Sequence, residues 1–192
     1  MDITGFWNLI DDVRRQCGDL DDIYDMTEPL VNELARLELD DIVIWHNIFA
    51  EYQRLSYKEK LWAAAYVING GCSDDGFDYF RAWLTAQGHN VFHAALNNPD
   101  TLAEVAAARE DECSFEDMLG VAMLAWHKKQ RLEERDYDAF YGACDKLPLT
   151  DAMQAEMLAG IDYDPEIDCE WDDDDEESLP AVVPALCAKF DW

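Results

Sequence analysis

Residues 61–84 read LWAAAYVINGGCSDDGFDYFRAWL: an apolar stretch, a glycine pair, and then a second, amphipathic stretch. In the second stretch Phe77, Phe80 and Leu84 lie three or four residues apart, which is the spacing of one helical face. The two glycines can adopt the left-handed backbone conformation that often ends a helix. The segment therefore predicts two α-helices joined by a tight reversal.

The same helical spacing continues on both sides of this segment. It predicts further helices at about residues 4–16, 90–97, 137–145 and 151–159, whereas strand signals are few and short. A chain of 192 residues is long enough for one well-buried core. We therefore predict an all-α fold, a single helical domain of about seven to nine helices over residues 1–160.

Hydroxyl and carboxylate side chains mark the predicted helix starts. Thr27 can cap a second helix, and Ser56 with Glu59 has the spacing of a capping box for a fourth. Asp74 is the predicted cap of the helix that follows the glycine pair, and Asp75 then lies at the positive end of its dipole.

The C-terminal part, residues 161–192, changes character. Between Asp162 and Glu177, 11 of 16 residues are acidic, and such a run usually repels itself and stays extended. Apolar residues return after it, so we expect the last segment to pack back on the helical domain and to leave the run as a tethered loop. The part of the run expected to interact with partners is Asp172, Asp173, Asp174, Asp175, Glu176 and Glu177.

The charge balance is strongly acidic, with 43 acidic against 14 basic residues and a formal net charge of -29. Direct nucleic-acid binding is not expected, because no basic stripe is present to displace counterions from phosphate. Binding to an anionic membrane is disfavoured for the same reason. A basic protein partner would be attracted, although the charge could also serve solubility alone.

Cysteine and histidine spacing gives no metal or redox motif. The six cysteines form no CxxC pair, and His89 and His93 lack an HExxH pattern. The alternating carboxylates at residues 162–168 resemble a calcium loop, but Ile167 stands where such a loop needs glycine. No basic and apolar leader opens the sequence, so we expect reduced cysteines in a cytoplasmic protein. Because no metal or cofactor motif is present, we expect neither a cofactor nor a metal.

The sequence resembles a bacterial family, the domain of unknown function 4240 (DUF4240). The resemblance centres on residues 61–77 and 78–84 and continues through shorter matches up to residue 100, the last of them Pro99-Asp100. The opening FWNLI at residues 6–10 and the closing LCAKF at residues 186–190 also fit the family's usual ends. The resemblance implies a soluble bacterial protein, and the family's name assigns no activity.

Polar groups gather at the glycine-broken junction, residues 69–81, and just beyond it. The candidate residues for a ligand or partner site are Asn69, Cys72, Asp74, Asp75, Asp78, Arg81 and Trp83. Asp78 and Arg81 are three apart on one helical face and can pair, and Arg81 could read a carboxylate or a carbonyl. In a purely structural role the same residues would cap the helix and tie it to a neighbouring loop.

No catalytic residue is assigned. Cys72 would need a base and a lowered pKa to act as a nucleophile. The start of the following helix would lower that pKa, but Asp74 and Asp75 would raise it again, and only the fold could bring His89 or His93 close enough to act as the base.

Two classes of function remain open. The first is a non-enzymatic interaction protein for a basic partner, either an immunity- or antitoxin-like inhibitor or a nucleic-acid mimic. The second is an enzyme or small-molecule binder centred on the junction. A concave pocket that joins the junction residues would favour the second, whereas helix-end contacts of Asp78 and Arg81 would favour the first.

Overall fold

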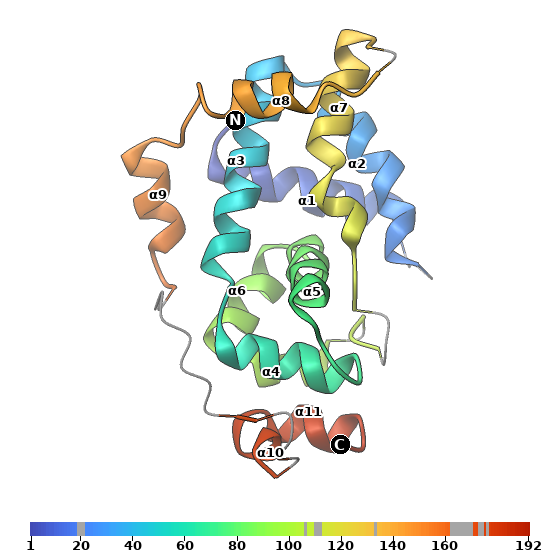
Figure 1. Ribbon diagram of the computed structural model, residues 1–192, viewed down its shortest axis with the longest axis vertical. Helices are drawn as coiled ribbons and strands as arrows, with labels where there is room; N and C mark the ends of the chain where they lie inside the picture. The colour runs from blue at the N-terminus through green and yellow to red at the C-terminus, as the bar shows by residue number, and fades with distance from the viewer. Residues whose placement is uncertain are drawn as a thin grey trace. The chain divides into compact units, whose positions relative to one another are not determined.

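The computed structural model describes residues 1–18, 22–105, 107–109, 113–132, 134–161, 171–172, 175 and 177–192 (Figure 1). These residues contain no strand, so the all-α prediction is confirmed over the described chain. Within them, nine α-helices have eight residues or more: α1 Ile3–Cys17, α2 Thr27–Leu34, α3 Leu39–Leu55, α4 Glu59–Ile68, α5 Asp74–Ala86, α6 His89–Asn97, α7 Val121–Gln130, α8 Tyr137–Cys144 and α9 Asp151–Leu158. Shorter elements are α10 Leu179–Val182, α11 Pro184–Lys189, and the 3-10 turns η1 Ile23–Met26, η2 Pro99–Glu104 and η3 Glu116–Leu119.

The chain divides into two compact helical units. Unit 1 contains residues 1–52 and 115–159, and unit 2 contains residues 53–114 and 160–192. The predicted boundary at residue 160, between a helical domain and a C-terminal extension, stays a prediction.

Unit 1 is built around an aromatic cluster between α1 and α3. The Phe6 ring lies 4.9 Å from Trp7, 5.0 Å from Trp45 and 5.6 Å from Tyr52, measured between centroids. Trp7 donates its indole N–H to the Tyr52 hydroxyl at 3.1 Å, which satisfies a polar group inside this cluster. Around it, α2 packs against α7, α8 against α7, and α9 against α1.

Unit 2 is built around α4 and α5. Trp62 stacks on Phe77 with centroids 4.9 Å apart and planes 10° apart, and Phe80 continues the row to Trp83 at 5.5 Å. Trp83 is only 2% exposed, so this candidate site residue is part of the core. Large buried rings of this kind dominate core energetics, at about 3–5 kcal/mol for truncation to alanine.

Two predicted helix caps are wrong, because their hydroxyl groups make other contacts. Thr27 is the first residue of α2, which follows directly from η1, and its hydroxyl donates to Asp117 at 3.1 Å. Ser56 donates to the Gln53 carbonyl at 3.1 Å, at the end of α3, and α4 begins only at Glu59. Each hydroxyl therefore donates to an acceptor other than the one that the spacing suggested: a side chain from another element for Thr27, and a carbonyl at the end of the preceding helix for Ser56.

The C-terminal helices pack within unit 2. α10 and α11 contact α4, and α11 also contacts η2. The Asp100 carboxylate accepts from the backbone N–H groups of Ala185 at 3.0 Å and Leu186 at 2.9 Å, in the first turn of α11. Trp171 and Trp192 each lie 5.5 Å from the Tyr66 ring of α4. Asp100 thus acts as a side-chain cap supplied by another element.

We expect Asp100→Ala to loosen this C-terminal packing, because two backbone donors of α11 lose their shared acceptor. The free energy of unfolding should fall by about 1–2 kcal/mol, and cleavage between residues 177 and 192 by a nonspecific protease should become faster. Limited proteolysis followed by mass spectrometry measures this. Asp100→Asn keeps one acceptor oxygen and should lie between wild type and Asp100→Ala; equal cleavage of all three proteins would contradict the role of Asp100.

No helix formed by the described part of the chain is long and apolar enough to cross a bilayer.

Candidate functional site

The junction between α4 and α5 is a helix stop followed by a helix start. Gly70 and Gly71 have φ of 63° and 131°, and the Gly71 N–H donates to the Tyr66 carbonyl at 2.9 Å. The predicted reversal is therefore confirmed. The predicted cap is one residue out: Ser73, with extended backbone, accepts from the Gly76 N–H at 3.1 Å, whereas Asp74 lies already inside the first turn of α5.

Asn69 braces the junction against a distant segment. Its side-chain N–H donates to the Cys113 carbonyl at 3.1 Å, and its side-chain oxygen accepts from the Cys113 N–H at 3.2 Å. This reciprocal pair satisfies both backbone groups of a buried residue. Both the N–H and the oxygen of the Asn69 side-chain amide are therefore used in a structural contact.

The Cys72 thiol is protonated at neutral pH. Burial raises its pKa to about 12, and the charge of Asp74 adds to the rise, while Trp62 and Arg81 oppose it. The thiol faces the Ser73 carbonyl at 3.6 Å, and Trp62 donates its indole N–H to the Cys72 carbonyl at 3.0 Å. A thiol is a poor nucleophile in this state, since the thiolate is the reactive form.

This predicts slow alkylation of Cys72. With a pKa of about 12, only about one thiol in ten thousand is ionised at pH 8. Iodoacetamide should therefore label Cys72 far more slowly in the folded protein than in 6 M urea, as peptide mass spectrometry measures. If Cys72 in the folded protein were alkylated as fast as free cysteine, the raised pKa would be contradicted.

Arg81 of α5, the last of the junction residues, is 5% exposed. Its guanidinium donates to the Phe77 carbonyl at 3.3 Å, to the Gln53 carbonyl at the end of α3, and to Asp78. It also lies over the rings of Tyr57 and Phe77, 4.9 Å and 4.8 Å from their centroids. Burial lowers the pKa of Arg81, and the charge of Asp78 opposes that shift.

The prediction from the sequence did not include two residues of this cluster, Gln53 and Tyr57. The pairing of Asp78 with Arg81 follows from their spacing on α5, but Gln53 precedes Arg81 by 28 residues and no local pattern links them. The structure thus brings Cys72, Asp78 and Arg81 together, while Asp75 is exposed in the first turn of α5.

The histidine pair on α6 has no third metal ligand among the residues that the structure describes. The His89 and His93 rings lie 4.3 Å apart, and burial, together with His89, lowers the pKa of His93 to about 4. No group of three or more histidine, cysteine or carboxylate residues in the described ranges is placed to hold a metal ion. The calcium-like segment at residues 162–168 lies outside those ranges.

The acidic run is described only in part. Asp172, Asp175 and Glu177 are exposed, whereas Asp173, Asp174 and Glu176 lie outside the described residues. Ser178 organises the described backbone, because its hydroxyl accepts from the Asp172 N–H at 3.0 Å and lies 2.7 Å from the Asp175 carbonyl.

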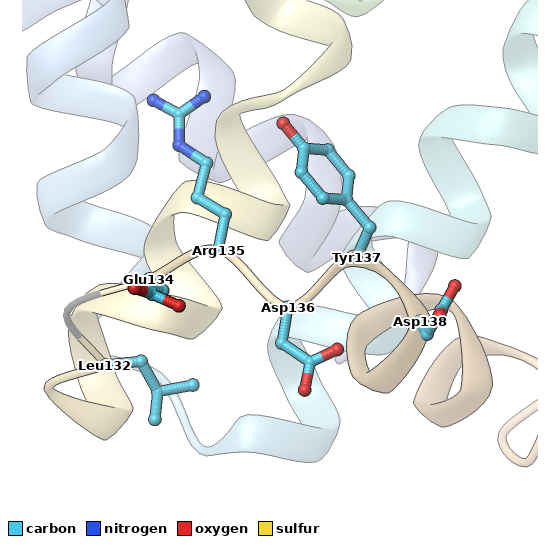
Figure 2. A pocket seen from close by; sticks show the side chains of 6 residues that line it. All are labelled: Leu132, Glu134, Arg135, Asp136, Tyr137 and Asp138. Atoms are coloured by element: carbon cyan, nitrogen blue, oxygen red, sulfur yellow. The ribbon is translucent and has the colours of Figure 1, made fainter.

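Two of the open pockets formed by the described residues lie in unit 1. The first, which we call the η1–α2–α7 groove, has a volume of about 810 Å³ and is lined by residues of these three elements. The second has a volume of about 630 Å³ and is lined by the loop before α8 and the first residues of that helix. Figure 2 shows its lining side chains: Leu132, Glu134, Arg135, Asp136, Tyr137 and Asp138. Arg135 and Tyr137 extend to one side of the loop in this view, and Leu132 and Asp136 to the other.

The loop of the second pocket is fixed by a buried histidine. His127 donates from Nδ1 to the Met123 carbonyl at 2.8 Å and accepts at Nε2 from the Asp136 N–H, also at 2.8 Å. Nε2 also lies 3.2 Å from the Asp136 carbonyl, so both ring nitrogens contact backbone groups. The carboxylate of Asp136 then caps α8 by accepting from Ala139 at 2.9 Å.

Comparison with known proteins places the chain in a family. The model of the family described as "Protein of unknown function (DUF4240)" matches residues 1–128, more than half of the chain. The matched part includes the whole junction, whereas the closing segment that also resembles the family lies beyond it. No curated protein and no solved structure matches the chain. The chain belongs to the DUF4240 family, as the motif at residues 61–84 predicted.

Proposed function

We propose that this protein is a non-enzymatic interaction module that presents an acidic surface to a basic protein partner. The observation that carries the proposal is the net charge of -29, together with the exposure of its carboxylates on both units. Examples are Asp12, Asp25 and Glu28 in unit 1 and Asp74, Asp75 and Glu104 in unit 2. Such a surface raises the rate at which an oppositely charged partner associates, and it repels nucleic acid and anionic lipid.

Contacts at the junction support this choice over an enzyme. The Arg81 guanidinium is bound to a helix end and to Asp78, and Asn69 is bound to Cys113. The Cys72 thiol is held protonated. These groups therefore contribute mainly to the structure of unit 2, and no observation at the junction favours a reaction.

Two forms of this function are compatible with the charge. An immunity- or antitoxin-like protein would cover the active surface of a basic toxic enzyme. A nucleic-acid mimic would instead place carboxylates where a basic protein normally holds phosphates. The two forms differ in competition: nucleic acid should displace a mimic from its partner, whereas an inhibitor that binds elsewhere should not be displaced.

The test is affinity capture from a lysate of the source organism, at about 0.05 M and about 1 M NaCl, followed by mass spectrometry. At about 1 M salt the Debye length is roughly 3 Å, so attraction between exposed charges is nearly lost. We expect one stoichiometric basic protein whose recovery falls sharply at high salt. A partner that is acidic, or that is retained equally at both salt concentrations, would refute the proposal, as would the absence of any stoichiometric partner.

A further inference from the structure

The lining of the η1–α2–α7 groove combines apolar and acidic side chains. Val31 of α2 and Leu124 of α7 supply apolar lining, and Tyr24 of η1 is 39% exposed beside them. Asp25 and Glu28 are exposed carboxylates in the same lining. Aliphatic side chains next to an exposed aromatic ring and to charged groups are common in protein-binding surfaces.

Neighbouring contacts add negative charge and rigidity to the groove. Asp117 of η3 accepts from the Thr27 hydroxyl at 3.1 Å, and the Glu116 N–H donates to the Tyr24 hydroxyl at 3.3 Å. The Tyr24 ring also lies edge-to-face on Phe115, with centroids 5.3 Å apart. These contacts hold Tyr24 in place before any partner arrives, which lowers the entropy lost on binding.

Among the described residues that line the groove, Lys128 is the one cation. Its ammonium group donates to the Asn32 side chain at 2.5 Å. The carboxylates of Asp25 and Glu28 therefore outnumber the positive charge in this lining, and the excess complements a basic ligand.

We propose that the η1–α2–α7 groove is the surface on which the basic partner docks, through a segment that alternates cationic and aliphatic side chains. Aliphatic groups of the segment contact Val31 and Leu124, and its cations face Asp25, Glu28 and Asp117. This inference rests on the proposed function and adds to it the place of binding and the chemistry of the bound segment.

The second pocket fits a basic segment less well. Its lining is also acidic, with Glu134, Asp136 and Asp138 against Arg135. Its one aliphatic side chain is Leu132, whereas the groove has both Val31 and Leu124. The groove therefore offers more contact to the aliphatic side chains of the segment.

The test uses an acetylated and amidated nine-residue peptide in which arginine alternates with leucine. A second peptide carries citrulline in place of every arginine, which keeps the shape and removes the charge. Binding to the full-length chain is followed by amide chemical-shift mapping and by calorimetric titration at low salt. We expect shifts to concentrate in residues 24–31 and 124–128 for the arginine peptide, and the citrulline peptide to bind at least tenfold more weakly.

Matched variants separate docking from general charge attraction. Asp25→Asn with Glu28→Gln should weaken binding of the arginine peptide about tenfold, from two ion pairs of ordinary strength. The control is Asp151→Asn with Glu156→Gln, which removes the same charges from exposed positions on α9 and should change affinity less than twofold. Lys128→Gln should strengthen binding about threefold, and the exposed Lys146→Gln should not. Thermal denaturation of each variant checks that the fold is kept.

Several results would overturn the proposal that the basic partner docks in the groove. These are shifts spread over all exposed carboxylates, shifts concentrated at residues 132–138, equal weakening by the groove pair and the α9 pair, or no binding of the peptide. The captured partner separates this inference from the proposed function. If a basic partner is captured in a salt-dependent way but binds the groove variants and the α9 variants equally, the groove is wrong and the interaction function stands.

Discussion

Replacing Arg81 by alanine is expected to lower the free energy of unfolding by about 3–4 kcal/mol. The side chain is 5% exposed, and its guanidinium links α5 to the end of α3 through the Gln53 carbonyl. Its removal deletes hydrogen bonds made by a charged group and the contacts with the Tyr57 and Phe77 rings, and it leaves a cavity. Urea denaturation followed by circular dichroism measures the loss.

Three further variants separate the contributions of Arg81. Arg81→Met keeps most of the packing volume and removes the hydrogen bonds, so we expect a loss of about 1–2 kcal/mol. Arg81→Lys keeps the charge but not the planar fork, and should fall between methionine and wild type. Asp78→Asn should lose less than about 1 kcal/mol, because the Asp78 side chain is 50% exposed. A loss below about 1 kcal/mol for Arg81→Ala would contradict the structural role of this residue.

Local patterns in the sequence predicted the helices well but not the contacts between them. The helix predicted at residues 4–16 is observed as Ile3–Cys17, because its apolar spacing records which face is buried. Thr27 and Ser56 were predicted as caps from spacing alone. Each hydroxyl instead bonds to an acceptor, Asp117 or Gln53, that the fold or the preceding helix end provides.

The same limit applies to the candidate site. The pair Asp78 and Arg81 follows from helical spacing, whereas Asn69 contacts Cys113, 44 residues away. The groove draws on η1, α2 and α7, and more than 85 residues separate α2 from α7 in the chain. Spacing along one helix cannot predict such assemblies, because they depend on how separate elements pack.

The stability of unit 1 is expected to depend on pH through His46. Burial lowers the pKa of His46 from 6.5 to about 4. The ring lies on α3 with Phe140 and Tyr141 of α8 around it, at centroid distances of 5.0 Å and 5.8 Å. Protonation would therefore place a charge on a half-buried ring beside aromatic side chains, where water solvates it less than in the unfolded chain.

The sign follows from proton binding in the two states. Above pH 6.5 the histidine is neutral both folded and unfolded, so it makes no pH-dependent contribution. Between about pH 6.5 and about pH 4 the unfolded chain binds the proton and the folded chain does not, so stability falls as the pH falls. The full loss is about 3 kcal/mol, of which about 2 kcal/mol is reached at pH 5.

His46→Gln isolates this effect from the titration of the carboxylates, which relieves charge repulsion in wild type and variant alike. We expect the variant to be the less stable protein at pH 7.5, by about 1 kcal/mol from lost packing, and the more stable one at pH 5. Urea denaturation at both pH values measures this reversal of order. His93→Gln in unit 2 should change in the same direction, since burial also lowers the pKa of His93 to about 4. A stability difference between wild type and His46→Gln that is the same at pH 7.5 and pH 5 would mean that His46 is protonated as readily in the fold as in the unfolded chain.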